Sequence, residues 1–151
     1  MSEVTAGKTT VGWREWVTLP ELPLGPIMAK IDTGAQTSAL HATDIVEVTL
    51  KDGQRGVQFR VYPDHMVVDN FRQVTAVLHD VRQVRNSGGI HSMRMVIRTQ
   101  LRIGNDIVLN PEVTLIERRI MRYPMLIGRT ALRKACALVD SHQSWLHGGG
   151  G

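Results

Sequence analysis

An apolar segment near the N-terminus of this chain ends abruptly in a carboxylate, a hydroxyl and a glycine. Residues 27–31 read Ile-Met-Ala-Lys-Ile, and Asp32, Thr33 and Gly34 follow them. The segment predicts a β-strand that carries Asp32 to a fixed point in the fold. Glycine permits a sharp backbone turn, so the amide of Gly34 can face the carboxylate. This feature favours folds in which a strand leads directly into a tight loop that presents one carboxylate.

The same three residues have the chemistry that aspartic proteolysis requires. In that reaction two carboxylates share one proton, and a hydroxyl such as that of Thr33 braces the pair through a matching loop. Asp-Thr-Gly occurs once in the chain, so a catalytic Asp32 requires a homodimer. The alternative is a structural turn, because Asp and Gly are common turn residues. On the catalytic interpretation, this segment is half of an active site that a second copy completes.

The composition is that of one globular domain. The chain has 151 residues, 42% of them hydrophobic, which is enough for a single modest core. We expect a domain over residues 11–140, between a flexible N-terminus at 1–10 and a flexible tail at 141–151. No apolar run approaches the roughly 18 residues that span a bilayer, and the first residues lack the apolar core of a signal peptide. These features predict a cytoplasmic protein. The single cysteine, Cys136, lies in an apolar run and is predicted to be buried.

The chain is basic, which favours an acidic partner. Its 18 Lys and Arg residues exceed its 14 Asp and Glu residues, and the pI is about 9.7. Nucleic acid and an acidic polypeptide both suit such a charge. An aromatic content of 5% provides few platforms on which bases could stack, so nucleic-acid binding is not expected. The alternative to an acidic partner is a basic surface that is simply solvated.

Most of the chain alternates between apolar and polar residues as β-strands do. Strands are predicted over residues 11–20, 26–31, 45–50, 56–62, 74–78, 99–103, 107–109, 113–116 and 137–139. The run Asn86-Ser87-Gly88-Gly89 separates two further β-type segments and predicts a hairpin. Its Gly-rich tip suits a moving lid as well as an ordinary hairpin. Thr130 to Ala135 contains good helix formers and predicts one short helix, with Thr130 as its N-cap.

Three separated blocks of the sequence resemble one bacterial family. They read Gly-Trp-Arg-Glu-Trp-Val at 12–17, Ile-Asp-Thr-Gly-Ala at 31–35 with Thr-Ser-Ala-Leu-His-Ala at 37–42, and Arg-Tyr-Pro-Met-Leu-Ile-Gly-Arg-Thr-Ala-Leu at 122–132. The family contains retropepsin-like aspartic proteases, is labelled ATP-dependent zinc protease and includes RimB-like proteins. The resemblance implies an all-β fold: a closed barrel with a Gly-rich flap hairpin, an inserted hairpin within residues 41–80 and one short C-terminal helix, working as a homodimer.

The expected site follows from the resemblance together with the charge pattern. Asp32, Thr33 and Gly34 match the catalytic residues, and substrate-binding residues are expected at Ala35, Arg85, Gly88, Gly89, His91, Arg94 and Arg129. Gln36 departs from the family pattern, which has Arg there, so no binding role is carried over to position 36. Despite the family label, the chain has neither a phosphate-binding Gly-rich motif nor a His-Glu-x-x-His motif. No ATP, zinc or other cofactor is therefore expected.

The expected substrate is an extended acidic polypeptide. Arg82, Arg85 and Arg94 flank the predicted flap, and arginine-lined grooves bind carboxylates well. RimB-like proteins resemble partners of glutamate ligases that add glutamate tails to a ribosomal protein. We therefore expect an aspartic endopeptidase in which Asp32 from each of two subunits activates water and which trims acidic or poly-glutamate tails. The alternative is a non-catalytic module of the same fold that binds peptide or dimerises.

Overall fold

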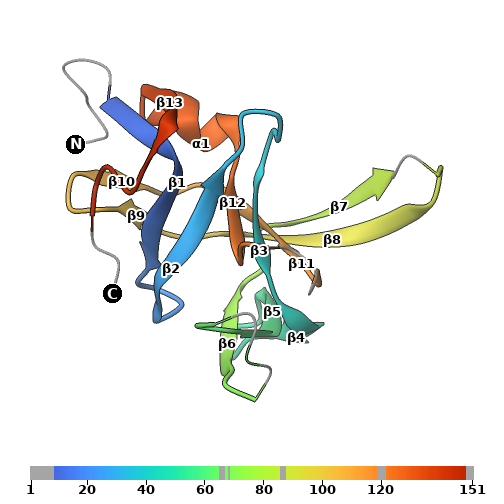
Figure 1. Ribbon diagram of the computed structural model, residues 1–151. Coiled ribbons are helices and arrows are strands. Elements are labelled where there is room, and N and C mark those ends of the chain that lie inside the picture. The colour runs from blue at the N-terminus through green and yellow to red at the C-terminus, as the bar shows by residue number, and fades with distance from the viewer. Residues whose placement is uncertain (1–8, 65–66, 68, 86–87, 119–121, 149–151) are drawn as a thin grey trace.

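The computed structural model describes residues 9–64, 67, 69–85, 88–118 and 122–148 (Figure 1). The N-terminal segment expected to be flexible lies largely outside this part of the chain. The described residues form mostly β-structure with one short helix, which confirms the predicted fold class. The strands are β1 Thr9–Leu19, β2 Leu24–Ile31, β3 Ser38–His41, β4 Thr43–Thr49, β5 Arg55–Val61, β6 Arg72–Val77, β7 Asp80–Arg85, β8 His91–Arg98, β9 Leu101–Ile103, β10 Ile107–Leu109, β11 Glu112–Ile116, β12 Met125–Ile127 and β13 Ala137–Ser144, and the helix is α1 Arg129–Lys134.

The main sheet follows the strand order β10-β9-β1-β2-β12-β3-β11-β8-β7, with β13 paired to β1 outside that path. No pairing between described residues joins β10 to β7, so the backbone ladder is open where the sequence predicted a closed barrel. The core cluster is built largely from the buried side chains of this sheet. Its largest fully buried side chains include Leu19, Ile27, Leu40 and Met125, which come from four different strands. Burial of these side chains is the main force that holds the strands together.

Strand β12 lies between β2 and β3, although more than eighty residues separate it from both in sequence. It runs parallel to β2, with Met125 opposite Ala29, and antiparallel to β3, with Met125 opposite Leu40. Alternate residues of β2 point to opposite faces: Ile27, Ala29 and Ile31 are buried, whereas Lys30 is exposed. The short β12 thus closes the gap between the two strands that flank the Asp-Thr-Gly loop.

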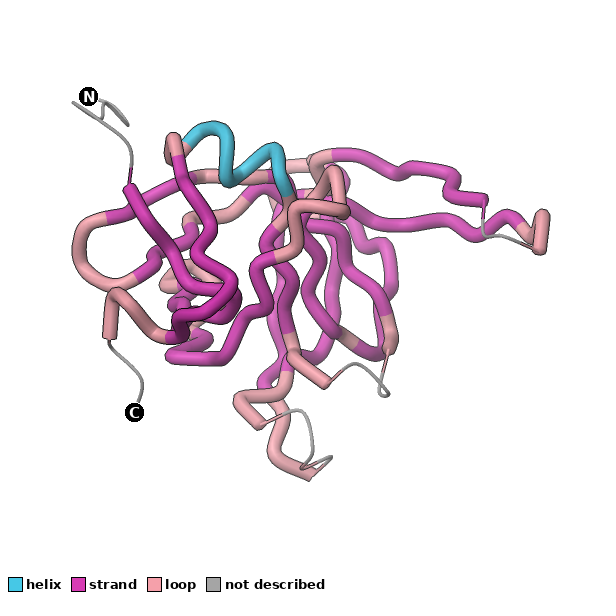
Figure 2. Tube along the Cα trace, turned by 45° about the horizontal axis from the view of Figure 1, so that its top comes forward, coloured by secondary structure: helices cyan, strands magenta, loops and turns pink. Residues whose placement is uncertain are grey.

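The predicted Gly-rich hairpin is present as a two-stranded arm that projects from the body of the protein (Figures 1 and 2). Strands β7 and β8 pair antiparallel from Asp80 opposite Val96 to Arg85 opposite His91. Near the tip, Gly89 has a φ of 80°, a left-handed conformation that glycine adopts without strain. Residues 86 and 87 of the expected turn lie outside the described residues.

The inserted hairpin is larger than predicted. Strands β4, β5 and β6 form a separate three-stranded antiparallel sheet, in which β5 is central. Val57, Phe59 and Val61 alternate along β5 and are all buried, so one face of this small sheet joins the main core. The sequence pattern had indicated β4 and β5 as a pair and had placed β6 only as an isolated strand, because strand partners far apart in sequence leave no local signal.

The helix lies where the sequence predicted it, but two details of its ends differ. It begins at Arg129 with Gly128 as N-cap, while the Thr130 hydroxyl donates a hydrogen bond of 2.8 Å to the carbonyl of Gln36. Cys136 is exposed, contrary to the prediction of burial. With a φ of 53°, it takes the left-handed position just after the helix that glycine usually fills. This turn directs the side chain outward. No helix among the described residues is long and apolar enough to cross a membrane.

The domain boundary expected after residue 140 does not appear in the fold. Strand β13 continues to Ser144 and runs parallel to β1. Beyond it, the ring of Trp145 stacks on Trp16 with centroids 6.5 Å apart. The buried carboxylate of Glu15 accepts hydrogen bonds from the next two backbone amides. Residues 141–148 thus pack against β1, a contact that the polar composition of the tail did not indicate.

Candidate functional site

Asp32 stands at the point where β2 passes into the predicted tight loop. Its backbone amide donates to the carbonyl of Ile127 on β12 at 2.9 Å, which fixes the end of the strand. The amide of Gly34 donates to Asp32 Oδ1 at 2.9 Å, as the sequence predicted. The amide of Ala35 donates to the Asp32 carbonyl at 3.2 Å and closes the turn. Asp32 itself is half-buried, so its carboxylate is held in place yet accessible.

The loop after Asp32 rests on the start of α1. The amide of Arg129 donates to the carbonyl of Ala35 at 2.8 Å, and its guanidinium donates to the carbonyl of Gly34 at 3.3 Å. A side chain on Gly128 would lie 2.7 Å from the carbonyl carbon of Thr37, closer than real contacts allow. The close approach of the two backbones therefore requires glycine at position 128. Arg129, predicted to bind substrate, here supports the loop that presents Asp32.

A hollow of about 460 Å³ opens beside Asp32. Its lining residues come from β1, β2, β12 and the segment before β12, and they are Trp13, Lys30, Asp32, Arg118, Arg122, Tyr123 and Leu126. Three cations thus line the same hollow as one carboxylate. Within the described residues, no ion pair engages Lys30, Arg118 or Arg122. A concave surface with this excess of positive charge attracts anionic ligands.

Sequence reasoning did not single out these three cations. Lys30 carried a usable signal, because residues two apart on a strand point to the same face, and it precedes Asp32 by two. Arg118 and Arg122 belong to a basic segment between β11 and β12 whose position depends on both strands. Only the insertion of β12 between β2 and β3 brings that segment to Asp32.

Two further hollows adjoin the one beside Asp32. On the side of the arm, a hollow of about 520 Å³ includes Arg94 and shares Arg118 with it. On the other side, a hollow of about 430 Å³ includes Trp16 and shares Arg122 and Tyr123. We call the three together the Asp32 groove. Among the arm residues predicted to bind substrate, Arg94 lines it.

The remaining predicted residues of the arm lie at its far end. Gly88, Gly89 and His91 are exposed near the tip, and Arg85 pairs with His91 across the hairpin. Gly88, Gly89 and His91 line none of the three hollows that form the groove. The structure therefore does not bring them to Asp32 in this position of the arm.

The base of the arm is held by an ionic cluster around Glu112. The Glu112 carboxylate lies 2.9 Å from both His79 and Arg82 and 3.6 Å from Arg98. Hydrogen bonding from Arg82 holds the pKa of Glu112 below its ordinary value, and His79 contributes in the same direction. Arg82, expected near substrate, is thus engaged with Glu112 and with Asp80 at 2.7 Å.

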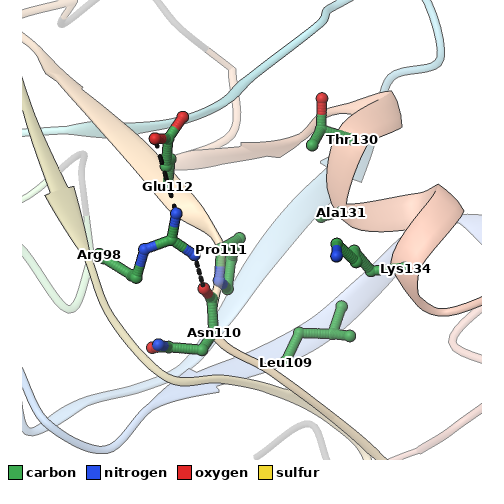
Figure 3. Close-up of a pocket in the computed structure, with 8 residues that line it drawn as sticks. All are labelled: Arg98, Leu109, Asn110, Pro111, Glu112, Thr130, Ala131 and Lys134. Carbon is green, nitrogen blue, oxygen red and sulfur yellow. Dashed lines mark hydrogen bonds and ion pairs between the residues drawn. The ribbon is translucent and has the colours of Figure 1, made fainter. Parts of the chain in front are cut away.

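A separate hollow of about 370 Å³ lies between α1 and β11 (Figure 3). In it, Arg98 bridges the carboxylate of Glu112 and the carbonyl of Asn110, while Lys134 faces it from the helix. None of the catalytic residues predicted from the sequence lines this hollow, and its carboxylate is already neutralised by cations. Among the described residues, no group of three His, Cys, Asp or Glu side chains is arranged to hold a metal ion.

Comparison with known proteins places this fold in context. A family model described as "RimB-like: Retropepsin-like aspartic endopeptidase RimB" matches residues 10–148. The crystal structure of the Legionella pneumophila protein Lpg0085, of unknown function, superposes with a TM-score of 0.75 at 26% identity and covers 95% of this chain and 99% of that one. The family match extends to residue 148 and so includes the tail, in agreement with the packing of residues 141–148 against β1.

Curated relatives carry a different name. The chain is 44% identical over 142 residues to a "Probable alpha-L-glutamate ligase" of Parasynechococcus marenigrum, and 37% identical over 125 residues to one of Desulfotalea psychrophila. These matches include 90% and 83% of this chain, but only 29% and 26% of the length of the two relatives. The chain thus spans less than a third of the relatives that bear the ligase name.

These names correct the predicted function. The sequence predicted an aspartic endopeptidase that trims acidic tails with one Asp32 from each of two subunits, or a non-catalytic module of the same fold. The curated relatives are named for glutamate ligation instead. The physical reason for the error is that the Asp-Thr-Gly motif fixes a loop and a carboxylate, whereas a fold supports several reactions. Both the family description and the relatives' names denote enzymes.

Proposed function

The chain belongs to the RimB-like family, and from that premise we propose that it is an enzyme domain that handles glutamyl chains alongside glutamate ligation. It holds an anionic, glutamate-rich polypeptide in the Asp32 groove. The observation that carries this proposal is that Lys30, Arg118 and Arg122 line one hollow together with Asp32. The names of the relatives supply the chemical class, because a glutamate ligase produces or extends chains rich in carboxylates.

The groove has the shape and charge that such a chain requires. An extended polypeptide places alternate side chains on opposite faces about 6 to 7 Å apart, so successive carboxylates on one face can meet successive cations. Arginine offers a planar set of donors to a carboxylate, and lysine a compact charge. Lys30 stands on β2 itself, whereas Arg118 and Arg122 approach from the segment before β12.

We take the enzyme type from the family description, a retropepsin-like aspartic endopeptidase, and propose Asp32 as the reacting carboxylate. Gly34 holds one carboxylate oxygen through its amide. The other oxygen is then available to exchange a proton with a water molecule or with the bound chain. The predicted homodimer, the bracing role of Thr33 and the cytoplasmic location remain predictions. The acidic partner is supported by the charge of the groove.

Binding of matched peptides tests the first half of the proposal. Fluorescence anisotropy would compare a labelled peptide of six glutamates with one of six glutamines, at several salt concentrations. We expect the glutamate peptide to bind at least tenfold more tightly at low salt, with an advantage that shrinks as salt screens the charges. Lys30→Ala should reduce that advantage, and Lys51→Ala, at an exposed turn outside the groove, serves as the matched control. Equal affinity for the two peptides would overturn the proposal.

Mass spectrometry of the same peptides tests the second half. The length of the glutamate peptide would be followed with wild-type protein and with Asp32→Asn, each with and without added glutamate and ATP. The proposal requires a change of chain length that wild-type protein produces and Asp32→Asn does not. Because Asn keeps the size of the side chain, the variant should retain binding. An unchanged peptide, or the same change with both proteins, would reject Asp32 as the reacting group.

A further inference from the structure

The outward face of β2 forms a line of three side chains that leads away from Asp32. Met28 and Lys30 on β2, and Asp32 directly after it, alternate with the buried residues Ala29 and Ile31 and so continue one face of the strand. Neighbouring strand β1 extends the pattern, with Trp16 opposite Met28 and Arg14 opposite Lys30. Along the strand, the surface therefore changes from a carboxylate to cations and then to an apolar area.

That apolar area lines the third hollow of the Asp32 groove, of about 430 Å³. Its walls are mostly aromatic, proline and thioether groups, contributed by Trp16, Pro26, Met28, Pro63, Tyr123 and Pro124. Such walls suit a ring packed against them. Arg14, Ile27, Asp64 and Arg122 complete the lining, so a ring bound there would meet apolar groups and could also stack on an arginine. The hollow thus differs in chemistry from its neighbour, although the two share Arg122 and Tyr123.

The walls are fixed before any ligand binds. The ring of Trp16 stacks on Trp145 at an interplanar angle of 21°. The Arg14 guanidinium lies 4.2 Å from the centre of the Trp145 ring and donates to the Tyr123 hydroxyl at 3.3 Å. Tyr123 also packs edge-on against Trp13. A surface held in this way loses little conformational freedom on binding.

We propose that this hollow is a subsite for an aromatic side chain of the same acidic polypeptide. The inference rests on the proposed function, because it assigns the occupant by continuity with the Asp32 hollow. Met28 precedes Asp32 by four positions, a distance of about 13 Å along an extended strand. A ligand lying along β2 would reach the subsite with the side chain four positions from the residue at Asp32. Recognition would then require both acidic residues and one aromatic residue at a set spacing.

A panel of peptides tests the spacing. Each peptide carries six glutamates and a single Phe or Ala at three, four or five positions from a fixed glutamate, on either side of it. Binding would be measured by anisotropy with Asp32→Asn, so that no reaction interferes. We expect Phe to tighten binding about tenfold over Ala at a spacing of four, on one side. At a spacing of three or five positions, the alternation of an extended chain turns the ring to the opposite face, so the gain in affinity from Phe should be lost.

Variants locate the gain on the protein. Met28→Thr, which keeps a strand-forming residue but removes the apolar group, should abolish most of the difference in affinity between the Phe and Ala peptides. Val108→Thr, at an exposed apolar position on β10, is the matched control and should change neither. A Phe advantage that is equal at all spacings, or that survives Met28→Thr, would overturn the inference. If glutamate and glutamine peptides bind alike, the proposed function fails; if glutamate is preferred and Phe adds nothing, only the subsite fails.

Discussion

Glu15 offers a direct test of how the C-terminal segment is attached to the domain. Its side chain is fully buried, and its carboxylate accepts a hydrogen bond of 2.7 Å from the amide of Gly12. It also accepts bonds of 3.1 Å from Leu146 and 3.2 Å from His147. One carboxylate thus joins an irregular part of β1 to the residues that follow β13. Replacement by alanine removes the acceptors of all three hydrogen bonds at once.

The expected loss of stability depends on whether each amide donor can reach water after the substitution. Gly12 is buried, so its amide would lose its partner without gaining water, at a cost of about 1–3 kcal/mol. Leu146 and the amide of His147 lie closer to solvent, and each should lose only the net value of a hydrogen bond, about 0.5–1.5 kcal/mol. We therefore expect Glu15→Ala to lower the free energy of unfolding by roughly 2–6 kcal/mol, a large part of the stability of a typical domain.

Urea denaturation, followed by far-ultraviolet circular dichroism and tryptophan fluorescence, would measure this change. Glu47→Ala is the matched control, since Glu47 is also a strand glutamate but pairs with Arg55 at the exposed surface. Such exposed ion pairs contribute little. The reasoning is refuted if the two variants have the same midpoint at equal slope. A fluorescence change centred on Trp145 before global unfolding would show that the tail detaches first.

Two further predictions concern the loop and the arm. Gly128→Ala would place a methyl group 2.7 Å from the Thr37 carbonyl carbon. We therefore expect a loss of about 1–3 kcal/mol in the free energy of unfolding and a change in the NMR chemical shifts of Asp32. An unchanged spectrum would contradict this expectation. Hydrogen bonding from Arg82, with His79, lowers the pKa of Glu112 from its ordinary 4.5. As pH falls, Glu112 is therefore protonated first in the unfolded chain, and the stability that its ion pairs provide above pH 4.5 is lost as pH falls toward the pKa of the folded state. Glu112→Gln should flatten that part of the plot of unfolding free energy against pH. An unchanged slope in this plot would argue against the cluster.

Features that depend on neighbouring residues in the chain could be read from the sequence. The strand before Asp32, the turn at Gly34 and the Gly-rich arm each follow from a few consecutive side chains, because strand alternation and glycine conformations are local properties. The hydrogen bond from the Gly34 amide to Asp32 is the clearest case. The short helix was also visible, although its N-cap was misplaced by two residues.

Other features arose only when distant segments met. Insertion of β12 between β2 and β3 brought Arg118 and Arg122 to Asp32, and it turned Arg129 into a support for the loop. Likewise, the buried carboxylate of Glu15 determined that the polar tail packs on β1. Local composition specifies which groups can turn, pair or bind. The partner that each group finds is decided by long-range strand order and burial, which no single segment contains.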